Sequence, residues 1–175
     1  ACAVLTGIGT VLDDDPLLNV RLPDSPRQPA LVVLDSQLRT PAQARLWQVA
    51  GRRVCIATAV TDAARQQPLQ ARGAQVLALP GDDGRVDLPA LLAHLARQEV
   101  NELHVEAGHR LNGALLRAGL VDELLLYQAP RLLGDGVGIA DLGPLAGLDQ
   151  ALAFDWHAIE RVGPDLRLLA RAPGR

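Results

Sequence analysis

Short apolar runs recur along the chain, separated by segments with helical periodicity. The runs that predict strands in the first part of the chain cover residues 2–8, 30–34, 53–58, 75–79 and 102–106. The run at 30–34 contains no polar residue, as is typical of a strand covered on both faces. Because these strands alternate with predicted helices, we expect an α/β fold built on a mostly parallel sheet.

One helix is predicted from the spacing of its leucines. Leu88, Leu91, Leu92 and Leu95 recur at i, i+3, i+4 and i+7, directly after Asp87. This spacing forms one apolar stripe that suits packing against a sheet, and the aspartate can accept hydrogen bonds from the first free N–H groups.

Two shorter helices are predicted between the strands. Residues 40–47 favour a short helix, and Thr61 or Asp62 caps a second one that Pro68 disturbs. Both connect predicted neighbouring strands, which is consistent with a parallel sheet.

The last part of the chain has a different pattern. Residues 122–129 predict a strand, and residues 152–162 and 166–171 predict an antiparallel pair around Gly163. We therefore expect antiparallel strands at the C-terminal edge of the sheet.

Residues 9–21 predict a loop with unusual chemistry. Three consecutive acids precede Pro16, which fixes its own φ angle and favours an extended Asp15. Arg21 ends the stretch with a planar cation that suits a phosphate or a carboxylate. Residues 22–29, with three prolines, predict a rigid connection. Taken alone, the stretch is either a solvated turn or a ligand site.

Composition narrows the possible functions. The 175 residues are 49% hydrophobic, which favours one domain over residues 1–175, and the net charge of −3 argues against nucleic acid or a membrane as partner. Every one of the 17 basic residues is arginine. The absence of lysine excludes Schiff-base catalysis and a Walker-type phosphate loop.

The cysteines and histidines indicate neither a disulfide nor a metal site. Cys2 and Cys55 are far apart, so we expect reduced thiols. His104 and Glu106 form a His-x-Glu sequence, but the chain has no Pro-Cys-x-x-Cys to complete a zinc site, so we expect no metal. No membrane-spanning run or signal peptide is visible, and we expect a cytoplasmic protein.

The turn at Gly108 is a second candidate ligand site. A helix predicted to run from this turn through Gly119 would present free N–H groups suited to a diphosphate. Gly113 within the helix indicates a close approach, either of a ligand or of the sheet. Glu106 ends the preceding strand, where open α/β sheets bind ligands, so a substrate contact is favoured. We expect this turn and Asp14 to face one shared crevice.

Two sequence blocks resemble one known family. They are Thr10-Val11-Leu12-x-Asp14-Asp15-Pro16-x-Leu18-x-Val20-Arg21 and the stretch 105–116 (VEAGHRLNGALL), the latter followed by 118–124 and 129–134. Both resemble, in order, the reductase domain of the bacterial bifunctional riboflavin-biosynthesis deaminase/reductase. The resemblance implies a dihydrofolate-reductase-like three-layer sandwich.

The resemblance also implies an activity, the NADPH-dependent reduction of 5-amino-6-(5-phosphoribosylamino)uracil to its ribitylamino form. Leu18, Arg21 and Glu106 match substrate-binding positions, with Arg21 holding the phosphate. The positions that match cofactor contacts are Thr10, Asp14, Ser36, Gly108, His109, Arg110, Leu111, Asn112, Gly113 and Ala114. No residue is assigned as catalytic acid or base.

The family further implies a homodimer and an N-terminal deaminase domain in the full-length protein. It also implies that the first strand and helix of the reductase domain lie outside this sequence. Two alternatives stay open: a non-catalytic nucleotide-binding remnant, and a related reductase acting on a pterin or another pyrimidine. No arginine is fixed near a 2′-phosphate, so the residues alone leave NADPH and NADH open.

Overall fold

The computed structural model describes residues 1–22 and 27–174, so part of the predicted connection at 22–29 lies outside the described residues. The chain divides into two units, Ala1–Leu111 and Asn112–Arg175. Within the described residues no helix is long and apolar enough to cross a membrane.

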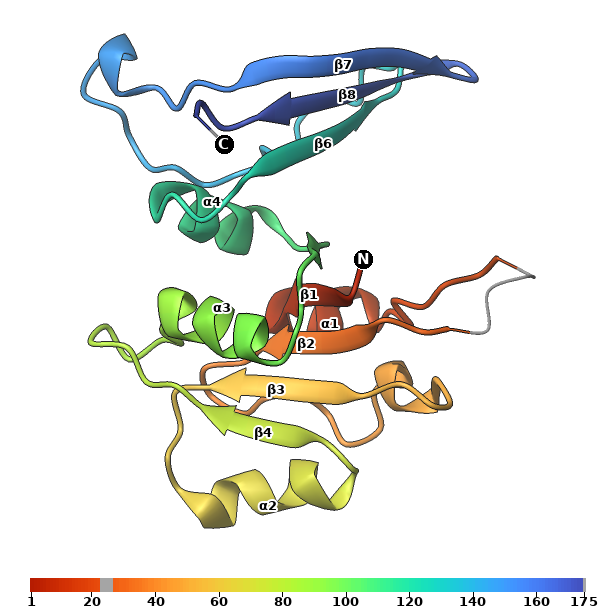
Figure 1. Cartoon of the computed structure of the whole chain (residues 1–175), viewed down its shortest axis with the longest axis vertical. Coiled ribbons are helices and arrows are strands. Elements are labelled where there is room, and N and C mark those ends of the chain that lie inside the picture. Colours follow the sequence, from red (N-terminus) through yellow and green to blue (C-terminus); the bar gives the residue numbers. More distant parts are fainter. Residues whose placement is uncertain (23–26, 175) are drawn as a thin grey trace. The chain divides into compact units, whose positions relative to one another are not determined.

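The first unit is built on a parallel sheet (Figure 1). Its strands, in spatial order, are β4 (Gln75–Ala78), β3 (Val54–Thr58), β2 (Ala30–Leu34), β1 (Ala3–Gly7) and β5 (Leu103–Val105). Every pairing between them is parallel. The predicted α/β fold is thus confirmed. Strand β1 lies between β2 and β5.

Helices cover this sheet because the chain must cross between parallel strands. The crossings contain α1 (Ile8–Asp14), the 3-10 helix η1 (Arg45–Gln48), α2 (Ala63–Ala71) and α3 (Leu88–Arg97). The first three lead outward from β1 to β4, whereas α3 leads back to β5 on the far side of β1. Since such crossovers are right-handed, α3 covers the opposite face of the sheet.

The main core cluster lies under the outward-leading helices. It contains Val11 of α1, Leu46 of η1 and Leu69 of α2 together with Val33 and Ile56 of the central strands. On the predicted leucine helix, Leu91 and Leu95 are buried, and the Asp87 carboxylate accepts a 2.9 Å hydrogen bond from Ala90 N. The predicted cap and stripe of α3 are confirmed.

The second unit contains an antiparallel sheet. Its strands are β6 (Glu123–Gln128), β8 (Asp165–Arg171) and β7 (Asp155–Val162), in that spatial order. The unit also contains most of α4 (His109–Arg117) and the short 3-10 helix η2 (Leu148–Gln150). The β7–β8 pairing around Gly163 confirms the predicted hairpin, and the antiparallel strands pair with one another in a sheet of their own.

Some predicted local structure was wrong. Residues 9–21 were expected to form a loop, but α1 runs from Ile8 to Asp14. Gly9 within it disfavours a helix, and burial of Val11 in the core outweighs that cost. Asp15 was expected to be extended, but it adopts a left-handed φ of 41° before Pro16, because in this conformation its N–H caps the helix by donating to Val11 O.

The two shorter predicted helices also differ from expectation in detail. The helix expected at 40–47 forms only as η1, from Arg45. The second helix is capped by Asp62 as expected, and Pro68 lies inside it without ending it. The intact helix shows that packing of Leu69 against the core outweighs the hydrogen bond that proline removes.

Leu91→Ala tests the packing of α3. Leu91 is fully buried, so its truncation is expected to lower the free energy of unfolding by about 2–5 kcal/mol. The matched control is Leu12→Ala on α1, where the side chain is 43% exposed and the expected loss is below about 1 kcal/mol. Urea unfolding followed by circular dichroism measures both, and equal losses would contradict this assignment of the core.

Candidate active site

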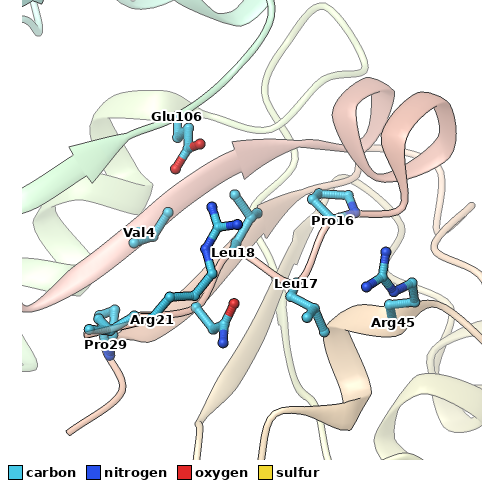
Figure 2. A pocket seen from close by; sticks show the side chains of 10 residues that line it. Val4, Pro16, Leu17, Leu18, Arg21, Pro29, Arg45 and Glu106 are labelled. Carbon is cyan, nitrogen blue, oxygen red and sulfur yellow. The ribbon is translucent and has the colours of Figure 1, made fainter. Parts of the chain in front are cut away.

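A pocket of about 350 Å³ lies over β1, between the loop after α1 and the end of β5 (Figure 2). Its walls combine apolar side chains with three charged ones. The lining residues are Val4, Pro16, Leu17, Leu18, Asn19, Val20, Arg21, Pro29, Arg45 and Glu106. All of them belong to the first unit, so the pocket lies within that unit.

Strand pairing brings Glu106 to this pocket. β5 runs parallel to β1 with Val4 opposite His104, and the pairing continues past the strand end because Glu106 N donates to Leu5 O at 2.9 Å. Side chains alternate along a strand, so Glu106 and Val4 point to the same face of the sheet. Val4 therefore lies under a carboxylate that comes from a distant part of the sequence.

Side-chain hydrogen bonds fix the other wall, the loop of residues 15–21. The Asp15 carboxylate accepts a 2.8 Å hydrogen bond from Arg45 N at the start of η1. The side-chain amide of Gln28 bonds both Val20 N, at 2.9 Å, and Val20 O, at 3.2 Å. These bonds hold the loop, which has no regular secondary structure, against the rest of the first unit.

The charges in the pocket favour an anionic ligand that also carries hydroxyl or N–H groups. Arg21, Arg45 and Glu106 are exposed, and none of them forms an ion pair within residues 1–22 and 27–174. Figure 2 shows the side chains of Arg21 and Glu106 pointing toward one another above β1. Two guanidinium groups suit a phosphate, and one carboxylate suits donors such as sugar hydroxyls.

The predicted substrate residues therefore meet in one place. Leu18, Arg21 and Glu106 all line the pocket. Arg45 lines it as well, and sequence reasoning missed this residue. No local pattern marks it, because its position depends on the contact between η1 and Asp15.

The predicted cofactor residues lie outside this pocket. Thr10 and Asp14 belong to α1, and neither Asp14 nor Gly108 is among the lining residues, so the pocket is not the shared crevice that we expected. Ser36 follows β2, and its hydroxyl accepts a 3.2 Å hydrogen bond from Val86 N.

The carboxyl ends of β1 and β5 nevertheless bring two helix starts together. A Cβ added to Gly7 would lie 3.6 Å from Leu111 Cδ2, so the end of β1 touches the first turn of α4. A Cβ added to Gly108 would meet nothing within 4 Å. The main chain that leads into α4 is thus open to a ligand, and its first N–H groups suit a diphosphate.

Gly113 has a neighbour that neither predicted alternative includes. A Cβ at this position would overlap the main-chain carbonyl of Asp141, in the segment that follows β6. Asn112 Nδ2 donates to Ile139 O at 2.9 Å, and Arg117 Nη1 donates to Asp141 O. This glycine therefore makes room for the segment at 139–141.

Neither thiol is a candidate nucleophile for this pocket. Burial raises the pKa of Cys55 to about 11, so the thiol is neutral at pH 7. Main-chain hydrogen bonds at Glu102 and Asn101 lower the pKa of Cys2, but that residue lies outside the pocket lining. Among the described residues, no three His, Cys, Asp or Glu side chains are placed to hold a metal ion.

Fold and pocket together define a class of protein: an α/β domain whose parallel sheet carries a pocket lined by two arginines and a glutamate. Comparison with known proteins narrows the class to one family. The RibD C-terminal domain family matches residues 1–168, and the chain belongs to this family. The resemblance predicted from the two sequence blocks is confirmed.

Individual relatives agree with this assignment. The riboflavin biosynthesis protein RibD of Escherichia coli K12 is 40% identical over 95% of the chain, which covers 47% of that protein. The 5-amino-6-(5-phosphoribosylamino)uracil reductase of Buchnera aphidicola is 26% identical over 95% of the chain and 84% of its own length. The structure of Acinetobacter baumannii RibD, form 1, aligns with a TM-score of 0.83 at 30% identity, covering 98% of this chain and 46% of that one. The chain spans about half the length of the RibD relatives.

Gly113→Ala tests the close contact with Asp141. Alanine normally favours a helix over glycine, but here its Cβ would displace the Asp141 carbonyl, so we expect a loss of about 1–3 kcal/mol in unfolding free energy. Gly108→Ala, which enters open space, is the control and is expected to change stability by about 0.5 kcal/mol or less. Urea unfolding of both variants measures the difference. A stabilised Gly113→Ala would show that segment 139–141 does not pack there.

Proposed function

We propose that this protein reduces 5-amino-6-(5-phosphoribosylamino)uracil to its ribitylamino form, with NADPH as the reductant, in riboflavin biosynthesis. Family membership supports the reaction class, since one relative of nearly matching length is named for this activity. The observation that carries the proposal is the meeting of Leu18, Arg21 and Glu106 in one pocket.

The pocket residues bind and orient the substrate. Arg21 and Arg45 hold the phosphate by charge-assisted hydrogen bonds, and Glu106 accepts hydrogen bonds from sugar hydroxyls or pyrimidine N–H groups. Binding energy from the phosphate is remote from the reacting carbon, so it can be used to position that carbon. Val4 and Leu18 exclude water beneath the sugar.

A reduced nicotinamide bound to this domain would supply a hydride to C1 of the open-chain sugar imine, whose C=N double bond would become a single bond as its nitrogen takes a proton from solvent. The residues proposed to hold this cofactor are Thr10, Asp14, Ser36 and those from Gly108 to Ala114. The open main chain at Gly108 fits this role. Since the hydride needs only close approach, positioning by these residues accounts for the rate.

We also propose a cytoplasmic homodimer. Cys2 and Cys55 are free thiols, which suits a reducing compartment. One face of the antiparallel sheet exposes large apolar side chains, including Trp156 at 59% and Ile159 at 60%, which pair with Ala170 and Leu168 of β8. Apolar surface of this kind favours an interface, here with a second copy. In RibD relatives a deaminase domain accompanies the reductase domain, and we propose the same companion for this protein.

Hydride transfer tests the reaction. With NADPH carrying deuterium at the transferred position, deuterium is expected at C1 of the ribityl chain, measured by mass spectrometry on the longest form of the protein that its gene encodes. Calorimetric binding of NADPH without any transfer would support the non-catalytic alternative and contradict the proposal.

Arg21→Ala and Arg45→Ala test phosphate recognition. Each is expected to raise the Michaelis constant for the pyrimidine about 10- to 100-fold, since a hydrogen bond to a charged group contributes about 1.5–3 kcal/mol. The control is Arg39→Ala, an exposed arginine outside the pocket, which should leave the constant unchanged. An unchanged constant for Arg21→Ala would favour a pterin or other unphosphorylated substrate.

Ile159→Glu tests the homodimer. A carboxylate in the exposed apolar sheet is expected to convert the protein to a monomer in sedimentation experiments, because burying an unpaired charge opposes association. The matched control is Glu160→Gln on the same strand. A wild-type protein that sediments as a monomer at micromolar concentration would contradict this part of the proposal.

A further inference from the structure

Arg52 is a buried cation behind the substrate pocket. It lies between η1 and β3 and is only 9% exposed. Its Nη1 donates to Leu17 O at 2.6 Å and to Leu18 O at 2.8 Å, and its Nη2 donates to Leu46 O at 2.5 Å. One side chain therefore joins the pocket loop to η1.

Among the residues that the structure describes, the Arg52 guanidinium has no carboxylate partner. Within the described parts of the chain Arg52 forms no ion pair, and its Nε is buried without a hydrogen-bond partner. Removal from water lowers the pKa of Arg52 below its ordinary value, yet a guanidinium remains charged at neutral pH. Burying an unpaired charge is costly, so structural cohesion alone is a poor explanation for it.

The carbonyls that Arg52 binds belong to a strained part of the pocket wall. Leu18 has a left-handed φ of 49°, a conformation that costs a leucine about 1–2 kcal/mol. Such residues persist only where their surroundings hold them. Three residues further on, Arg21 projects from the same loop into the pocket (Figure 2).

We propose that Arg52 is a positioning residue for the substrate site: it fixes the Leu17–Leu18 turn so that Arg21 faces Glu106, and it places a second layer of positive charge behind the bound phosphate. This inference rests on the proposed function for the identity of the ligand. The control of the loop by Arg52 is a property of the free protein and is independent of the proposed function.

A lysine cannot replace this group fully. The planar guanidinium reaches three carbonyls on two segments, whereas an ammonium is a compact point charge. Arg52→Lys should therefore keep the charge and lose much of the loop control. Arg52→Met should lose both, with a side chain that still fills the apolar space.

Hydrogen exchange tests the loop without any substrate. The peptide containing Val20, whose N–H is bonded to Gln28, is expected to exchange at least about tenfold faster in Arg52→Met, with a smaller increase in Arg52→Lys. Strand β2 should keep its wild-type exchange in both variants. The matched control is Arg53→Met, since Arg53 is exposed and adjacent in sequence.

Steady-state kinetics and ribose 5-phosphate binding test the ligand side. Arg52→Met is expected to raise the Michaelis constant for the pyrimidine about 30-fold, with Arg52→Lys between it and wild type. The constant for NADPH should change less than about twofold in both variants. Weaker binding of ribose 5-phosphate should follow the same order.

These measurements distinguish a failure of the positioning role of Arg52 from a failure of the proposed function. Unchanged exchange at Val20 in a folded Arg52→Met variant would overturn the positioning role, and so would equal changes in β2 and the loop. A wild type that binds ribose 5-phosphate and turns over no pyrimidine would refute the proposed function alone. If Arg52→Met does not fold, Arg52→Lys decides by the same two measurements.

Discussion

The parallel pairing of β1 with both β2 and β5 is the constraint on which the site depends. It places β1 inside the sheet, next to β5, which is the last strand of the first unit along the sequence. Because pairing continues through Glu106 N to Leu5 O, the orientation of the Glu106 side chain follows from the register. A shift of one residue would turn this carboxylate to the face that α3 covers.

The rest of the site is a loop held in place by side chains from elsewhere in the first unit. Asp15, Gln28 and Arg52 each bond main-chain groups, and these bonds join residues 15–21 to η1 and to the segment before β2. Arg21 thus projects from an irregular segment whose main chain is held by these bonds at Leu17, Leu18 and Val20. The pocket combines a rigid sheet floor with a wall whose shape depends on a few polar bonds.

Much of the fold could be predicted because its determinants are local. The apolar run at 30–34, the leucine spacing after Asp87 and the hairpin at Gly163 each specify an element from neighbouring residues. Helix α1 could not be predicted. Two glycines and three acids in and beside this segment indicate a loop, whereas the buried Val11 stabilises a helix. Among the pocket residues, the family resemblance predicted Leu18, Arg21 and Glu106. Arg45 and Arg52 could not be predicted, because their places depend on hydrogen bonds with distant segments that no local pattern marks.

In the proposed function, Arg21 and Glu106 bind one phosphorylated sugar between them, over β1. A crystal structure of the protein with ribose 5-phosphate tests it most directly. We expect phosphate oxygens within hydrogen-bond distance of the Arg21 guanidinium and a sugar hydroxyl that donates to the Glu106 carboxylate. A phosphate bound at the start of α4, with the pocket over β1 empty, would contradict it.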